Sequence, residues 1–274
     1  MRNFISEDDI EQAILQKLEG DPFQYGILRC DPSPDKRELL PDGTGRSSKK
    51  ECVLPLILRE ALARLNPDIP GEKLEEIARD LCRDFSATDM TATNYKYYNQ
   101  IRNGIKISLR RNGKEDFDFV KLVDFDRPEN NTFTAVSQMW IQGRVYWRRP
   151  DVLIFINGLP MVFVELKNSI VKVEEAYNDN LKNYLRDIPN LFALNQICVL
   201  SNGLETRLGA FNATYNHFFE WLKVDSEKER PDRQALKEAG TVGESSVRYF
   251  IDGLLQKGRL IDYVENFIMF RNQK

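Results

Sequence analysis

The sequence of 274 residues has little of what most hydrolytic enzymes and metalloproteins rely on. There is one histidine, His217, and the four cysteines (Cys30, Cys52, Cys82 and Cys198) form no Cys-x-x-Cys pair. This pattern argues against a zinc site and a disulfide framework, so we expect four buried, reduced cysteines and a histidine that serves packing. No Gly-x-x-x-x-Gly-Lys-Ser/Thr stretch occurs, so these residues carry no phosphate-cradling loop.

Long hydrophobic runs are missing as well. The longest are short segments such as residues 152–156, far below the roughly 18 residues that span a bilayer. The N-terminus turns acidic at residues 7–9, which does not match a signal peptide. We therefore expect a cytoplasmic protein with no membrane contact. A net charge of −3 argues against broad, charge-driven binding of nucleic acid, although a local basic groove remains compatible with it.

The composition, with 42% hydrophobic, 30% charged and 11% aromatic residues, is typical of a globular protein of one large or two small domains. Ser6 and Asp9 predict a capping box at the start of a helix that Gly20 ends. Further helices are predicted at residues 53–66, 72–84, 92–106, 172–187 and 247–268.

Strand patterns dominate the middle of the chain. Asn112-Gly113 predicts a hairpin turn, and short apolar runs predict strands at residues 132–141, 152–156, 161–164 and 192–200. The Pro-, Gly- and Ser-rich residues 33–50 are expected to form an exposed loop. Charged residues 225–243 are expected to separate the helical end from the rest.

Three charged residues stand at the ends of two of these apolar runs: Asp151, Glu165 and Lys167. Glu165 and Lys167 share one face of a strand, because side chains alternate along it. A two-residue turn at Asn157-Gly158 would place Asp151 on the wrong face for Glu165. We therefore predict a three-residue turn, pairing residue 156 with residue 160, or a β-bulge, either of which sets Asp151 opposite Glu165.

Two carboxylates without histidine or cysteine are hard oxygen ligands, which suit Mg²⁺ or Mn²⁺. Such an ion can activate a water for attack on phosphorus, with Lys167 positioning that water or stabilising negative charge. The competing interpretation is an ion pair at the strand edge. Charge at the ends of buried runs is costly to leave unpaired, which favours a functional site.

Pro150-Asp151 followed by Glu165-Leu166-Lys167 resembles the PD-(D/E)xK nuclease motif. The surrounding sequence is similar to the N-terminal endonuclease domain of type I restriction enzyme R subunits, from about Ser6 to Phe270. The stretches that carry this resemblance are residues 127–133, Ser137-Gln138, 148–160, 164–168, 201–204 and 219–221.

The resemblance implies an α/β fold with a PD-(D/E)xK core, a central mixed β-sheet flanked by helices, and a helical C-terminal tail. It also implies Mg²⁺-dependent cleavage of double-stranded DNA, with methyltransferase and specificity subunits as partners. ATP would act only through a motor domain that these residues lack. We expect a nuclease domain at residues 1–225, with a helical insertion at about 53–106, and a linker region at 226–274 leading to the motor.

Several site residues follow from the same resemblance. Asp151, Glu165 and the Leu166 carbonyl would ligate the metal, and a glutamate of the first helix would stand beside it. Glu11 is the candidate for that glutamate and Glu7 competes with it.

The family also has a Gln-x-x-x-Tyr motif on the following helix, as part of the catalytic set. Tyr184 matches its tyrosine, but Asn180 replaces its glutamine. The two residues share a helix face, where they would touch DNA or support Lys167, while Tyr184 packed on the sheet is the alternative.

Basic residues near the motif could follow DNA phosphates: Arg144, Arg148, Arg149, Lys172 and Lys182. Trp140, Trp147 and Trp221 are expected in the core. Two further functions stay open, a free-standing nuclease of repair or phage defence and a non-catalytic module that holds DNA or docks a subunit.

Overall fold

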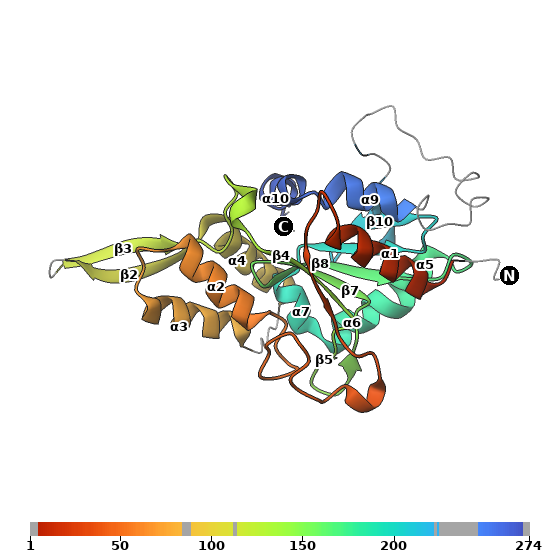
Figure 1. Ribbon diagram of the computed structural model, residues 1–274, viewed down its shortest axis with the longest axis horizontal. Coiled ribbons are helices and arrows are strands. Elements are labelled where there is room, and N and C mark those ends of the chain that lie inside the picture. Colours follow the sequence, from red (N-terminus) through yellow and green to blue (C-terminus); the bar gives the residue numbers. More distant parts are fainter. Residues whose placement is uncertain (1–4, 84–88, 112–113, 222–223, 225–245, 271–274) are drawn as a thin grey trace.

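A computed structural model describes residues 5–83, 89–111, 114–221, 224 and 246–270 (Figure 1). The predicted turn at Asn112-Gly113 and the charged segment 225–243 lie outside these residues.

The centre of the molecule is a mixed β-sheet, as expected. Within the described residues it has seven strands in the order β1-β4-β7-β8-β9-β10-β11. β7 lies between β4 and β8 and is antiparallel to both, whereas β1 runs parallel to β4 and β9 runs parallel to β8. The bounds are β1 Gly26–Arg29, β4 Phe133–Ser137, β7 Val152–Ile156, β8 Leu159–Leu166, β9 Ile197–Ser201, β10 Thr206–Gly209 and β11 Phe219–Glu220.

Helices cover both faces of this sheet. β7 and β8 are consequently buried along their whole length, as continuous apolar strands require. On one face, Val152, Ile154 and Val164 join the core that includes α1 (Glu7–Glu19) and α9 (Ser246–Leu254). On the other, Leu153 and Phe163 pack with the helical segments of residues 173–194. Figure 1 shows α1 and α9 on one side of the strands, and α6 (Lys182–Asp187) and α7 (Pro189–Leu194) on the other.

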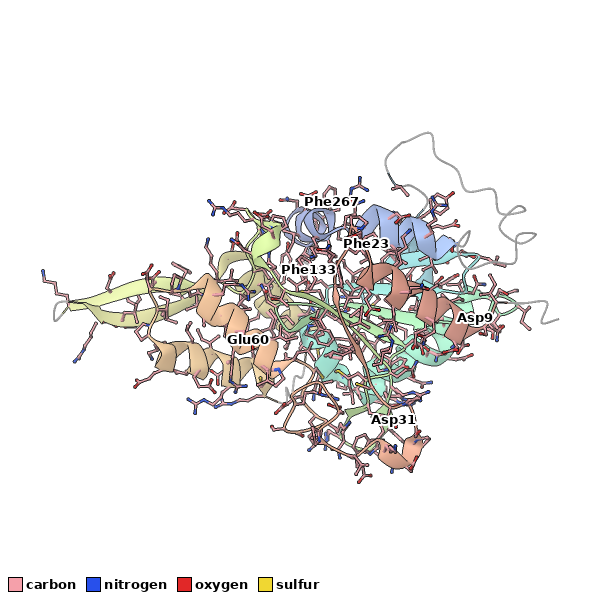
Figure 2. The ribbon with its side chains drawn as sticks, in the orientation of Figure 1. Asp9, Phe23, Asp31, Glu60, Phe133 and Phe267 are labelled. Carbon is pink, nitrogen blue, oxygen red and sulfur yellow. The ribbon has the colours of Figure 1, made fainter. Side chains whose placement is uncertain are left out.

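The first helix begins as predicted. The side chains and backbone N–H groups of Ser6 and Asp9 form a reciprocal capping box, and Gly20 follows the last residue of α1. The helices α2 (Pro55–Leu65), α3 (Gly71–Cys82) and α4 (Met90–Asn103) confirm the three helices expected between residues 53 and 106. Figure 2 shows the core side chains Phe23 and Phe133 among these elements, while Glu60 on α2 is exposed.

Two hairpins stand outside the main sheet. β2 (Ile105–Arg111) and β3 (Lys114–Val120) pair antiparallel around the predicted turn and project from one end of the molecule (Figure 1). β5 (Ile141–Gln142) and β6 (Trp147–Arg148) form a second, shorter hairpin. The single strand expected at residues 132–141 is therefore divided into β4 and β5.

The strand predicted at residues 192–200 is wrong in its first half. Pro189 begins a separate helix, α7 (Pro189–Leu194), and β9 starts only at Ile197. Proline is favoured in the first turn of a helix, where no N–H is needed. The side-chain amide of Asn195 bonds the carbonyls of Met161 and Ile197, which holds the chain at the change from helix to strand.

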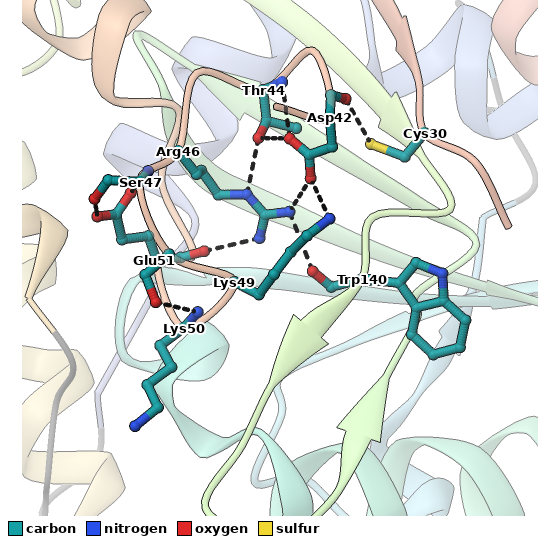
Figure 3. Close-up of polar contacts among 10 residues, drawn as sticks. Cys30, Asp42, Thr44, Arg46, Ser47, Lys49, Lys50, Glu51 and Trp140 are labelled. Atoms are coloured by element: carbon teal, nitrogen blue, oxygen red, sulfur yellow. Dashed lines mark hydrogen bonds and ion pairs between the residues drawn. The ribbon is translucent and has the colours of Figure 1, made fainter. Parts of the chain in front are cut away.

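The exposed loop predicted at residues 33–50 is exposed or half-buried over most of its length, but it has buried residues that were not expected. Arg46 and Lys49 are buried, with both cations on the carboxylate of Asp42 at 2.7 Å (Figure 3). The Arg46 guanidinium also donates to the carbonyls of Glu51 and Trp140. Burial is tolerated because the charges are paired and hydrogen-bonded.

The C-terminal helices pack against the body of the protein. Val247, Phe250 and Leu254 of α9 and Leu260 and Val264 of α10 (Lys257–Asn266) belong to the apolar core beside α1. Short 3₁₀ turns lie between these elements: η1 Pro34–Lys36, η2 Pro128–Asn130 and η4 Tyr215–His217.

The four cysteines are free thiols, as predicted, although Cys82 is only partly buried. None of the helices in the described part of the chain combines the length and apolarity that crossing a bilayer requires.

Candidate active site

The register between β7 and β8 decides whether the three charged residues meet. The turn at Asn157-Gly158 has two residues and pairs Ile156 with Leu159, so the three-residue turn is wrong. The register then shifts, because Phe155 pairs with Pro160 but Ile154 pairs with Val162. Met161 is the extra residue of this β-bulge, and Val152 consequently lies opposite Val164. The bulge alternative is confirmed, and it brings Asp151 beside Glu165.

Asp151 stands at the rim of the sheet, partly exposed. Its Oδ2 accepts the backbone N–H of Leu166 at 2.7 Å, and its Oδ1 lies 3.4 Å from the side-chain nitrogen of Gln138. Desolvation of the carboxylate by the surrounding protein raises the pKa of Asp151 to about 6. This effect outweighs the hydrogen bonds and the charge of Lys167, which lower the pKa.

Glu165 is buried, with 2% of its surface exposed. Its Oε1 lies 3.5 Å from the Lys167 ammonium and accepts the Asn180 amide. The Tyr184 hydroxyl also faces this carboxylate, and Oε2 is buried with no regular hydrogen bond from the described residues. Burial, and after it the charge of Asp151, raise the pKa of Glu165 well above its usual range. A buried oxygen without a partner is costly, so a bound proton or cation would stabilise this carboxylate.

Lys167 brings the positive charge to the site. Its Nζ lies 3.0 Å from the carbonyl oxygen of Leu166 and 3.7 Å from Glu7 on α1. Its backbone N–H bonds the carbonyl of Ser201 at 2.8 Å, which fixes the end of β8 on β9. The ammonium therefore sits between the first helix and the two strand carboxylates.

The helix after Lys167 is confirmed, but it contains a wider turn. α5 (Val173–Glu175) leads into the π-helical turn η3 (Ala176–Leu181) and then α6 (Lys182–Asp187). Asn180 lies in the π turn and donates to Glu165. Tyr184 is buried, its hydroxyl donates to the Arg149 carbonyl at 2.9 Å, and its ring packs on Phe163. Tyr184 thus holds the backbone two residues before Asp151.

Of the two first-helix candidates, Glu11 is buried while the side chain of Glu7 is 44% exposed. Glu11 accepts the side-chain amide of Gln138, which also faces Asp151. Burial is the main cause that raises the pKa of Glu11 to about 7. Glu11 and Glu7 therefore both border the site, but from different sides and with different solvent contact.

Gln138 is the residue whose part in the site the sequence did not reveal. It follows β4 with a positive φ of 56°, its N–H bonds the carbonyl of Asp151 at 3.0 Å, and its Oε1 is buried without a partner. The polar pair Ser137-Gln138 at the end of a buried strand was the available signal. An open cleft of about 370 Å³ is lined by Gln138, Glu11, Asp151 and Arg149.

The donor set fits a hard divalent cation. Asp151 and Glu165 are desolvated carboxylates, Glu165 has an unpartnered oxygen, and the Leu166 carbonyl lies beside them. Magnesium sites commonly use one or two carboxylates and several waters. Among the described residues, no three acidic, histidine or cysteine side chains are grouped closely enough to form a ready-made cage, and Gln138 stands between Glu11 and Asp151.

The predicted basic residues are placed differently from one another. Arg148 pairs with Asp187, Arg149 lies over the Trp140 ring and donates to the Pro32 carbonyl, and Lys182 lies over the Tyr177 ring. Arg144 and Lys172 are exposed. Contact with phosphates stays a prediction for all five.

The other aromatic expectations are mixed. Trp140, Trp147 and Trp221 are half-buried, so they border the core and do not fill it. His217 is exposed and bonds Thr214 at 2.8 Å, so its predicted role in packing is wrong. It ends the short turn η4, which keeps its ring at the surface.

Comparison with known proteins places this chain in a family. Residues 4–217 match the model described as type I restriction enzyme R protein N terminus. The chain is 30% identical over 270 residues to the type I restriction enzyme HindI endonuclease subunit of Haemophilus influenzae, covering 97% of this chain and 24% of that protein. It is 29% identical over 285 residues to the putative type I restriction enzyme MjaIXP endonuclease subunit of Methanocaldococcus jannaschii, covering 97% of this chain and 26% of that protein. The chain therefore spans about a quarter of the length of these relatives.

Proposed function

The chain belongs to the family of type I restriction enzyme R protein N-terminal domains, and we propose that it is the Mg²⁺-dependent DNA-cleaving domain of such a subunit. The observation that carries this proposal is the meeting of Asp151, Glu165 and Lys167 across the β7–β8 bulge. The endonuclease subunits named above are the relatives that support it.

The proposed metal ligands are the carboxylates of Asp151 and Glu165 and the carbonyl of Leu166, with Glu11 at the edge of the site. Mg²⁺, or Mn²⁺ in its place, would neutralise charge on the phosphate and make a bound water more acidic. Asp151 is held ready by the Leu166 N–H and by the Gln138 backbone. Asn180 and Lys167 orient Glu165 through the same oxygen, Oε1, which leaves Oε2 open.

Lys167 would act on the attacking water or on the negative charge that develops at phosphorus. Its side chain is 16% exposed and its Nζ is held near the Leu166 carbonyl and Glu165. Such a partly desolvated ammonium stabilises charge more strongly than one in bulk water.

The rest of the proposal concerns the whole subunit. DNA would be brought to this site by an ATP-driven motor outside these residues, and the recognised sequence would be read by specificity and methyltransferase subunits. We propose the nuclease domain at residues 1–225, and α9 and α10 within the region that leads to the motor.

The test uses the full-length R subunit in its assembled complex with Mg²⁺ and ATP. Asp151→Asn, Glu165→Gln and Lys167→Ala should each reduce plasmid cleavage about a hundredfold or more, while ATP hydrolysis continues. Glu60→Gln, an exposed acid on α2 (Figure 2), is the matched control and should cleave normally. Full cleavage by the three site variants would contradict the proposal and favour a non-catalytic module that holds DNA or docks a subunit.

A further inference from the structure

The short hairpin of β5 and β6 ends in an exposed apolar tip, formed by Arg144, Val145 and Tyr146. Val145 is 77% exposed and Tyr146 is 56% exposed. The turn itself is tight, because the Gly143 N–H bonds the Tyr146 carbonyl at 2.9 Å. Two neighbouring apolar side chains are thus presented to solvent at the end of a projecting turn.

The hairpin is anchored on one side by the loop of residues 33–50. The Gln142 N–H bonds the Lys49 carbonyl at 3.0 Å, and Arg46 donates to the Trp140 carbonyl at 3.1 Å. Figure 3 shows that Arg46 and Lys49 both reach the carboxylate of Asp42. A buried set of charges therefore fixes the base of the hairpin.

The hairpin is anchored on the other side by α6. Arg148 donates to the carboxylate of Asp187 at 2.7 Å, and a Cβ at Gly143 would collide with the Asp187 carbonyl oxygen. Only glycine allows the two backbones to approach so closely. The tip is therefore exposed on a rigid support.

Arginine side chains border the tip. Arg186, with its side chain 63% exposed, lies over the Tyr146 ring at 5.9 Å, and Arg37 lies over the Trp147 ring at 5.4 Å. In the described part of the chain no acid pairs with Arg144. Asp187 is shared by Arg148 and Arg186, which leaves one excess positive charge there.

The tip is also tied to the candidate active site through the chain. β6 leads through Arg149 and Pro150 directly to Asp151, so Val145 and Asp151 are at most about 20 Å apart along the chain. The Tyr184 hydroxyl fixes this connection at the Arg149 carbonyl. A DNA duplex with a phosphate at Asp151 would have its neighbouring groove within that distance.

We propose that this tip inserts into a groove of the DNA duplex beside the cleaved phosphate. Val145 and Tyr146 would contact sugars and base edges, as apolar wedges do in the minor groove, and Arg144 and Arg186 would contact the flanking phosphates. DNA is favoured over a protein partner because the apolar pair is bordered by arginines and adjoins the site for phosphate. This inference rests on the proposed nuclease function and adds the surface that orients the substrate.

Photocrosslinking in the assembled, full-length complex tests the contact directly. Tyr146→p-benzoylphenylalanine is combined with Asp151→Asn, so that uncut, labelled plasmid is retained while ATP and Mg²⁺ are supplied. Irradiation should give a protein–DNA adduct at position 146. The matched control is Phe119→p-benzoylphenylalanine on the β2–β3 hairpin, where Phe119 is 54% exposed, and it should give at least tenfold less DNA adduct. An adduct with another protein subunit, no adduct, or equal DNA adduct from both positions would overturn the proposal.

A cleavage assay supplies the functional half of the test. The double variant Val145→Ser, Tyr146→Ala should cleave plasmid about tenfold more slowly at unchanged ATP hydrolysis, whereas Phe119→Ala should not. Unchanged cleavage by the double variant would count against the inference. Because crosslinking does not require cleavage, failure of the Asp151 assignment is seen separately, as cleavage that persists in the Asp151→Asn complex.

Discussion

The backbone N–H of Leu166 donates a hydrogen bond of 2.7 Å to the carboxylate of Asp151, from one strand of the central pair to the start of the other. The bond depends on the bulge at Met161, since without it Asp151 would be opposite Val164. It occupies one carboxylate oxygen of Asp151 and leaves the other facing Gln138 and the cleft. The hydrogen bond therefore orients the acid that we propose as a metal ligand.

The two acids of α1 can be separated by metal binding. Glu11 is buried against Gln138, whereas Glu7 is largely solvated beside Lys167. We expect Glu11→Gln to weaken Mn²⁺ binding about tenfold and Glu7→Gln to change it little. Isothermal titration of the 274-residue chain with Mn²⁺ measures both. A larger loss from Glu7→Gln would make Glu7 the first-helix acid of the site.

Stability in EDTA should fall as the pH rises. Burial raises the pKa of Glu11 to about 7 and that of Asp151 to about 6, and it raises the pKa of Glu165 as well. Because the folded state binds these protons more tightly than the unfolded state, the stabilisation is fully present only below about pH 4, and the parts due to Asp151 and Glu11 are lost as the pH rises through about 6 and 7. Glu11 alone accounts for about 3 kcal/mol.

The measurement is urea unfolding of the 274-residue chain at pH 5 and pH 8. Excess Mg²⁺ should stabilise the chain more at pH 8, where the carboxylates are charged, than at pH 5. Glu165→Gln should flatten the dependence on pH. A chain in EDTA that is more stable at pH 8 than at pH 5 would contradict the assignment of these burial effects.

The meeting of Asp151 and Glu165 was predictable, and the turn chemistry even indicates how it is achieved. Asn157 and Gly158 adopt positive φ values of 52° and 82°, as a two-residue hairpin turn requires. With that turn, the odd residue that the site needs has to be inserted in the strand, at Met161. The contact between Gln138 and Glu11 was not predictable, because it joins residues 127 positions apart in the sequence.

The errors have a common origin in long-range burial. Residues 189–194 are too few for periodicity to separate a helix from a strand. The carbonyls at the end of this helix are bonded by the distant side chain of Asn94 on α4, which reaches Phe192 and Asn195. Arg46 and Lys49 were expected at the surface because their segment is rich in turn residues. Their burial follows from Asp42 and from a backbone carbonyl at Trp140.

Tyr184 is expected to position Asp151 through the Arg149 carbonyl. Tyr184→Phe removes that hydrogen bond, which should cost about 1 kcal/mol of folding stability and slow cleavage about tenfold. Tyr177→Phe is the matched control, since its hydroxyl donates to the Ala213 carbonyl at 3.0 Å, away from the carboxylates. It should lose similar stability with normal cleavage. Urea unfolding and plasmid cleavage by the full complex are compared, and equal cleavage by the two variants would remove Tyr184 from the site.

Asp42 should be the most sensitive residue of the loop that supports the β5–β6 hairpin. Burial alone would raise its pKa, but Arg46 and Lys49 outweigh burial and hold the pKa of Asp42 below its usual range. Asp42→Asn leaves these two cations buried, with side chains 0% and 5% exposed, and without a carboxylate. We expect a loss of about 3–5 kcal/mol, measured by urea unfolding at pH 7.

The matched control is Asp31→Asn, just before this loop. Asp31 pairs with Lys36 at 3.1 Å, with their side chains 43% and 51% exposed, and Figure 2 shows Asp31 at the surface. Its replacement should change stability little, because exposed ion pairs contribute little.

The direction in which stability changes with pH also distinguishes Asp42 from the active-site acids. Since its folded pKa is lowered, its contribution is present above about pH 4 and is lost on acidification, so the parent and Asp42→Asn should converge in stability as the pH falls below 4. Equal losses from the two variants at pH 7 would mean that the buried charges are not what holds the loop, and the rigid support inferred for the hairpin tip would lose its basis.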